Sequence, residues 1–175
     1  MYHRAHTKTW DLVTLGEALI EFNQTHPGEP QYLQGFGGDT SNAAIAAARA
    51  GVRTAYLTRV GQDAFGDALL SLWQREGVDS TAVQRDASQP TGVYFVTHGE
   101  AGHQFSYLRA SSAASRMTPA WIETPPTLQM LQNCRLLMVS GISLALSSTA
   151  CDAALAAMHI ARKAGAQIAF DSNLR

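Results

Sequence analysis

The stretch LQGFGGDTSNAAIAAARAG, residues 33–51, places three glycines just before a helix that is made almost wholly of alanine. Gly37 and Gly38 let the backbone approach a ligand closely, and the start of a helix offers free backbone N–H donors. Asp39 adds an acceptor that suits sugar hydroxyls, and Asn42 offers both a donor and an acceptor. On the residues alone, a binding loop and a tight turn with a helix cap at Asn42 are equally good interpretations.

Strands and helices alternate on either side of this stretch. Ser41 or Asn42 is the expected cap of the alanine helix, and Asp63 is the expected cap of a second, amphipathic helix. The pattern predicts strands over residues 11–15 and 52–61 and helices over residues 42–50 and 63–77. This order favours parallel βαβ units and therefore an α/β fold.

The segment TGVYFVTHGEAGHQFSYLR, residues 91–109, breaks that rhythm. Two β-rich runs separated by HGEAG predict a hairpin. Because successive side chains on a strand point to opposite sides, His103, Phe105, Tyr107 and Arg109 are expected on one face. An antiparallel hairpin inside a βαβ series suggests a flap that leaves the main sheet.

The α/β pattern then returns and stops abruptly. RLLMVSG, residues 135–141, and AQIAFDSNLR, residues 166–175, are apolar runs typical of strands buried in a parallel sheet, and residues 147–165 form an alanine-rich helix between them. The sequence ends one or two residues past a strand, without the next helix. We expect the last strand to be exposed and prone to association.

Composition and motifs exclude several classes of function. The formal net charge is −1, which does not indicate nucleic acid as a partner, and no apolar run approaches the roughly 18 residues of a membrane span. The N-terminus lacks the apolar core of a signal peptide, so the cytoplasm is the expected location. No histidine pair has metal-ligand spacing, Cys134 and Cys151 are expected as reduced thiols, and no Rossmann, P-loop or GxSxG motif occurs.

The spacing after the glycines carries a resemblance to a known family. From Asn42 the sequence runs through one residue to Ala44, through six to Gly51, and through nine more to Gly61. With the preceding Gly-Gly, this resembles the N-terminal signature of the ribokinase-like (PfkB) carbohydrate kinases. VGQDAFGD and AFDSNLR resemble two further family segments, whereas Thr40 stands where many members carry Gly, Ala or Pro.

The resemblance implies a ribokinase-like α/β fold, in which a parallel sheet is flanked by helices and carries a small β-lid. It extends over essentially the whole chain but covers roughly the N-terminal half to three-fifths of a typical member. Residues 1–175 are therefore expected to be the N-terminal part of one such domain, incomplete at the C-terminus. The lid elements are expected at about residues 17–36 and 91–110.

Within the family, GGDTSN and FSYLRASSAAS are most similar to the 2-keto-3-deoxygluconate kinases. The resemblance implies a sugar-acid substrate, with ATP and Mg²⁺ as cofactors of the complete enzyme and no metal site in this chain. The implied substrate-binding residues are Gly37, Gly38, Asp39, Asn42, Tyr94, Tyr107, Arg109 and Arg175. The residues implied at the ATP phosphates and Mg²⁺ are Asp171, Asn173 and Arg175. Guanidinium groups suit the substrate carboxylate, since they can donate two parallel N–H bonds to it.

The catalytic base of the family lies in a Gly-Ala-Gly-Asp turn, which has no match in these 175 residues. We therefore expect the sugar half of the site to be present and the chain alone to be inactive. Another sugar kinase such as a fructokinase, or a non-catalytic sugar-binding module, remains an alternative. Lids of this family often pack between subunits, so a homo-oligomer is expected. Two roles remain open for Glu17: it orients the sugar loop, or it caps the end of a strand. Ser112 and Ser115 are expected as turn or helix-cap residues.

Overall fold

The computed structural model describes residues 8–100 and 102–173 of the chain. Its main sheet is parallel throughout, with the strand order β10-β9-β1-β4. The strands are β1 (Trp10–Leu15), β4 (Thr54–Leu57), β9 (Cys134–Ser140) and β10 (Gln167–Asp171). The predicted parallel α/β architecture is confirmed.

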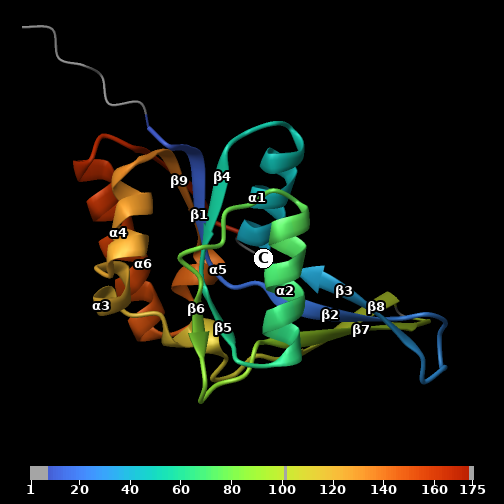
Figure 1. Cartoon of the computed structure of the whole chain (residues 1–175). Helices are drawn as coiled ribbons and strands as arrows, with labels where there is room; N and C mark the ends of the chain where they lie inside the picture. The colour runs from blue at the N-terminus through green and yellow to red at the C-terminus, as the bar shows by residue number, and fades with distance from the viewer. Residues whose placement is uncertain (1–7, 101, 174–175) are drawn as a thin grey trace, which may run out of the picture.

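Helices cover both faces of this sheet (Figure 1). One face packs against α3 (Pro119–Ile122), α4 (Pro125–Gln132) and the alanine-rich α6 (Ser148–Lys163), and the other against α1 (Asp39–Arg49) and α2 (Ala64–Arg75). Alanines of α6 lie fully buried against Val13 and Leu15 of β1, because their small side chains let the helix pack closely on the sheet. Trp73 and Tyr56 form the centre of the other core, with ring centroids 4.8 Å apart.

A second sheet projects from the main one and forms the lid (Figure 1). Its order is β3-β2-β7-β8, built from β2 (Leu19–Gln24), β3 (Tyr32–Gly37), β7 (Val93–Gly99) and β8 (Gly102–Leu108). The two hairpins are antiparallel, and β2 and β7 join them in parallel. Residues 17–36 and 91–110 thus lie side by side although they are far apart in the sequence.

The alanine helix begins earlier than predicted. α1 starts at Asp39, with Gly38 at the cap position, so the predicted caps at Ser41 and Asn42 are wrong. The backbone N–H of Asn42 already donates to the Gly38 carbonyl, and the hydroxyl of Ser41 is buried and accepts a hydrogen bond from the Trp73 indole N–H at 2.9 Å. Tertiary contacts therefore use the side chain that local sequence assigns to the helix cap.

The single strand predicted over residues 52–61 is also wrong in one respect. It divides into β4 in the main sheet and β5 (Arg59–Gly61), which leaves that sheet and pairs in parallel with β6 (Gln84–Asp86). Thr58, between the two, is fully buried, and its carbonyl accepts the backbone N–H of Gln84. The long-range pairing with β6 is invisible in the local pattern.

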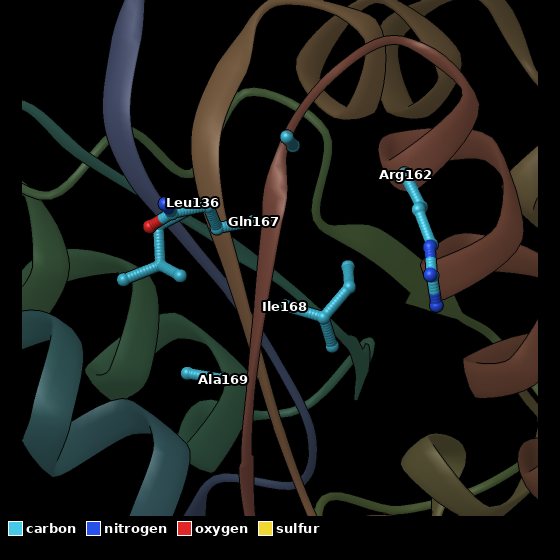
Figure 2. Close-up of a pocket in the computed structure, with 6 residues that line it drawn as sticks. Leu136, Arg162, Gln167, Ile168 and Ala169 are labelled. Atoms are coloured by element: carbon cyan, nitrogen blue, oxygen red, sulfur yellow. The ribbon is translucent and has the colours of Figure 1, made fainter.

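The outer edge of the sheet is open at β10. This strand pairs only with β9 among the described residues, and Phe170 is 51% exposed. A hollow of about 550 Å³ lies here. Figure 2 shows Arg162 and Ile168 on one side of β10 and Leu136 and Ala169 on the other. The hollow is the uncovered edge of the sheet, not an enclosed site.

Asp63 joins the start of α2 to the start of the lid. It caps α2 by accepting the Gly66 N–H at 2.7 Å, and its other oxygen accepts the Thr91 N–H at 2.8 Å. The Thr91 hydroxyl donates to Asp63 and accepts the Gly61 N–H. Burial alone would raise the pKa of Asp63, but the backbone N–H donors of Thr91 and Gly66 hold that pKa below its ordinary value.

We expect Asp63→Ala to destabilise the chain by about 2–4 kcal/mol at pH 7, because a helix cap is lost and two buried donors of Thr91 lose their acceptor. Urea unfolding followed by circular dichroism measures this. The difference should shrink as pH falls through the lowered pKa, since the stabilising carboxylate is then protonated.

Asp67→Ala is the matched control in the same helix. Its carboxylate is 65% exposed and makes one surface ion pair, with Arg85, so it should cost less than about 1 kcal/mol. Equal losses for the two variants would contradict the role assigned to Asp63.

Candidate functional site

A pocket of about 380 Å³ lies between the lid and the carboxyl ends of the main-sheet strands. It is lined by Glu17, Leu19, Gly37, Gly38, Asp39, Asn42, Tyr94, Phe105, Tyr107, Arg109 and Ile142. Seven of the eight residues selected from the sequence as substrate-binding are among them. The eighth, Arg175, lies outside the described residues. The structure brings the seven together; their binding of a substrate stays a prediction.

Gly37 and Gly38 leave no room for side chains at the floor of the pocket. A Cβ on Gly37 would lie 2.6 Å from the ring of Tyr94. Gly38 has a φ of +111°, and its Cβ would lie 2.5 Å from the carbonyl oxygen of Glu17. The two glycines therefore allow the β3–α1 connection to pass directly over the β1–β2 connection and close to the ring of Tyr94.

Asp39 and Asn42 stand on the first turn of α1. The Asp39 carboxylate accepts the Thr40 N–H at 2.7 Å through one oxygen and the Asn173 side-chain amide at 3.2 Å through the other. Each oxygen retains acceptor capacity for a ligand hydroxyl. Asn42 is exposed, and its side chain makes no hydrogen bond to the rest of the described chain. Both side chains are thus free to face a polar ligand.

The lid supplies an aromatic wall. Tyr94 of β7 lies directly opposite Tyr107 of β8, with ring centroids 5.6 Å apart, and Phe105 stacks 6.4 Å from both rings. The Tyr94 hydroxyl donates to Glu21, and burial, together with that carboxylate, raises its pKa. Tyr94 therefore offers the pocket its ring, because its hydroxyl proton is already engaged.

Arg109 follows β8 and lines the pocket. Its Nε lies 2.9 Å from Oε2 of Glu17, and its Cζ lies 5.7 Å from the ring centroid of Tyr107. Glu17 is 3% exposed, and its other oxygen, Oε1, accepts a hydrogen bond from the Ser112 hydroxyl. Burial raises the pKa of the Glu17 carboxyl, and the positive charge of Arg109 offsets part of that rise.

The residues implied at the nucleotide lie at the end of β10. Asp171 is exposed and accepts the Asn173 backbone N–H at 2.9 Å. Asn173, with a φ of +44°, reaches across to Asp39. Neither lines the pocket. The contact nevertheless joins the two groups of residues that the sequence assigned to sugar and to nucleotide.

Sequence reasoning left four lining residues without a role. Phe105 shares a strand face with Tyr107 and Arg109, so the alternation could have identified it. Glu17 lies just beyond Gly16 after the first strand, and its role was left open. Leu19 and Ile142 carry no chemical signal and enter the pocket only through the tertiary packing.

No helix among residues 8–100 and 102–173 combines the length and apolar character of a membrane span.

Comparison with known proteins identifies relatives of this chain. It is 34% identical over 171 residues to a 2-dehydro-3-deoxygluconokinase of Thermoproteus tenax and 33% identical over 171 residues to fructokinase-2 of Solanum habrochaites. In each case the match covers 94% of this chain and 50% of the relative. The chain therefore spans about half the length of these relatives.

Solved structures share the fold. A PfkB protein from Polaromonas sp. JS666 superimposes with a TM-score of 0.87 at 34% identity, covering 95% of this chain and 56% of that one. A putative ribokinase II from E. coli in complex with ATP and Mg²⁺ gives 0.84 at 26%, with 95% and 54% covered. The expected ribokinase-like α/β fold is thereby confirmed. Since the model of the pfkB family carbohydrate kinases also matches residues 10–175, the chain belongs to that family.

Proposed function

We propose that this chain binds a sugar acid in the pocket beneath the lid, as the sugar-binding part of an ATP-dependent kinase. The proposed substrate is 2-keto-3-deoxygluconate (2-dehydro-3-deoxygluconate), which the complete enzyme converts to its 6-phosphate. The observation that carries this proposal is the position of Arg109, whose guanidinium shares one pocket with the hydroxyl-binding groups of Asp39 and Asn42. A cation beside hydroxyl acceptors complements a ligand with both a carboxylate and hydroxyls.

A neutral-sugar kinase such as a fructokinase is the alternative substrate class. Relatives of the two kinds are equally similar to this chain, at 34% and 33% identity. Overall similarity therefore does not separate them. The guanidinium of Arg109 supports the sugar acid, because a neutral sugar gains little from it while a carboxylate gains charge-assisted hydrogen bonds.

ATP and Mg²⁺ are the proposed cofactors of the complete enzyme. Asp171, Asn173 and Arg175 are proposed to lie near the phosphates, and a structural relative carries both ATP and Mg²⁺. The exposed carboxylate of Asp171, at the carboxyl end of a parallel strand, suits a water-mediated contact with a hard cation. Bound there, Mg²⁺ would neutralise charge on the phosphates.

The residues of this chain bind and orient; they do not supply the base. Phosphoryl transfer requires a residue that accepts the proton of the attacking hydroxyl. Asp39 is held by Thr40 and Asn173 in a position that suits hydrogen bonding to hydroxyls. The catalytic Gly-Ala-Gly-Asp turn has no counterpart in the sequence. A non-catalytic sugar-binding role of the chain by itself is consistent with this.

We expect the purified 175-residue chain to release no ADP above background with ATP, Mg²⁺ and 2-keto-3-deoxygluconate in a coupled assay, while calorimetry detects binding of the sugar acid. Robust turnover would contradict the assignment of the catalytic base to another segment. Absence of binding at millimolar sugar would contradict the proposed pocket.

Arg109→Gln should weaken binding of the sugar acid about tenfold to a hundredfold and that of fructose less than about threefold, because only the acid loses charge-assisted hydrogen bonds. Glutamine keeps an N–H donor for Glu17. Isothermal titration calorimetry measures both ligands, and Arg49→Ala, an exposed arginine paired with Glu76, is the control. Equal losses for the two sugars would favour a neutral-sugar kinase.

The exposed part of the lid face that also carries the aromatic wall of the pocket is proposed to join two copies of the chain. Leu33, Phe105 and Tyr107 lie on one face of the lid sheet and are 68%, 53% and 48% exposed. Apolar side chains gathered on one face are typical of an interface between proteins. The proposed location of the chain is the cytoplasm.

We expect the chain to elute as a dimer or larger species in size-exclusion chromatography with light scattering. Leu33→Lys should shift it toward monomer, because a charge is placed in the apolar face. Leu155→Lys changes a 50% exposed leucine on α6, away from the lid, and should leave the elution unchanged. A wild-type monomer would contradict association through the lid.

A further inference from the structure

The guanidinium that favours a sugar acid is already paired within the protein. Arg109 lines the pocket, is one-quarter exposed, and lies against Glu17 through Nε. Among the described residues, Glu17 is the one carboxylate within ion-pair distance of Arg109. An incoming carboxylate therefore shares Arg109 with Glu17 and does not meet a free cation.

The surroundings of Glu17 are shaped to hold a carboxyl group. Ser112, itself 1% exposed, donates its hydroxyl to Oε1. Gly92 leaves the space beside the same oxygen open, since a Cβ there would lie 2.9 Å from it. Oε2 lies within ion-pair distance of Arg109 but accepts no well-aligned hydrogen bond from any described residue. One oxygen is thus fixed, and the other is free to carry a proton.

The charges around Glu17 do not balance once an anion binds. The groups that face it are Arg109 after β8, Asp39 on α1, the neutral hydroxyl of Ser112, and the buried Tyr56 of β4. Two carboxylates, Glu17 and Asp39, already share the pocket with one guanidinium. A ligand carboxylate would make three negative charges around one positive charge, and like charges at this range disfavour the ionised form of each group.

We propose that Glu17 is a positioning residue that controls how much of the charge of Arg109 is available, and that an anionic sugar binds together with a proton taken up by Glu17. A neutral sugar binds without that proton. The inference rests on the proposed function of the pocket as a sugar site. It adds a second residue that determines charge specificity, and this residue lies in the connection between β1 and β2.

The step is a simple protonation. Solvent supplies the proton, Oε2 of Glu17 receives it, and no other bond is made or broken. The neutral carboxyl keeps its contact with Ser112 and no longer competes for Arg109, whose terminal N–H groups then pair with the ligand carboxylate. Burial raises the pKa of Glu17 even without ligand. The additional rise in pKa that protonates Glu17 when the ligand binds is therefore smaller than it would be for an exposed carboxyl.

Calorimetry of the wild-type chain provides the first test. Titrations with 2-keto-3-deoxygluconate in phosphate and in Tris, which differ in ionisation enthalpy, count the protons taken up. We expect uptake of up to one proton, with affinity falling toward a limiting slope of about tenfold per pH unit above the pKa of free Glu17. Fructose should give no uptake and a flat pH profile.

Glu17→Gln is the matched variant, since it keeps the shape and removes the charge. It should bind the sugar acid at least as tightly as the wild type at pH 8, with no proton uptake. Glu29→Gln alters an exposed glutamate of the β2–β3 connection and should behave as the wild type. In the absence of sugar, the wild type should lose stability relative to Glu17→Gln as pH rises above about 4.5, because a carboxyl whose pKa is raised by folding destabilises the fold when ionised.

The outcomes separate the inference from the proposed function. Binding of both sugars with the same proton count in wild type and Glu17→Gln would overturn the inference and leave the sugar site intact. Binding of fructose alone would overturn the sugar-acid assignment and the inference with it. Failure of both sugars to bind the wild type would overturn the proposed function itself.

Discussion

The backbone contact at Gly38 fixes how the main sheet, the lid and the first helix meet. A residue with a side chain there would strike the carbonyl oxygen of Glu17 at 2.5 Å and Cα of Ala18 at 2.9 Å, and a φ of +111° is open to glycine at little cost. The connection between β3 and α1 therefore rests directly on the connection between β1 and β2. Asp39, at the start of α1, and Glu17, in the connection between β1 and β2, face one pocket for this reason.

Buried hydroxyl groups anchor the helix that follows. The Thr40 hydroxyl lies 3.2 Å from that of Tyr56, and Ser41 accepts the indole N–H of Trp73. Gly16 makes room for this threonine, because a Cβ on it would lie 2.3 Å from the Thr40 hydroxyl oxygen. Thr40 departs from the residue types common in the family, and the space and partner around it explain how the fold accommodates it. Buried polar groups satisfied in this way hold α1 in a single position.

The pocket illustrates a general constraint on recognition of anions inside a protein. A guanidinium in a partly buried wall needs a counter-charge when no ligand is bound, and Glu17 provides it for Arg109. The same counter-charge then opposes the ligand. The site can satisfy both states only if one carboxyl changes its protonation or moves away. Charge specificity in this pocket thus depends on Glu17, which pairs with the binding group, as well as on the guanidinium of Arg109 itself.

Sequence by itself determined the α/β class, the parallel order of its elements and the lid hairpin, because periodicity, glycine spacing and strand ends are local signals. The resemblance of its motifs to a known family added the seven residues that come to line the pocket. Only the tertiary structure decided the start of α1, the departure of β5 to pair with β6, the engaged hydroxyl of Tyr94, and the pairing of Arg109 with Glu17. Each of these depends on a partner many residues away, and a side chain with two available partners is assigned by packing and desolvation, which a local pattern does not contain.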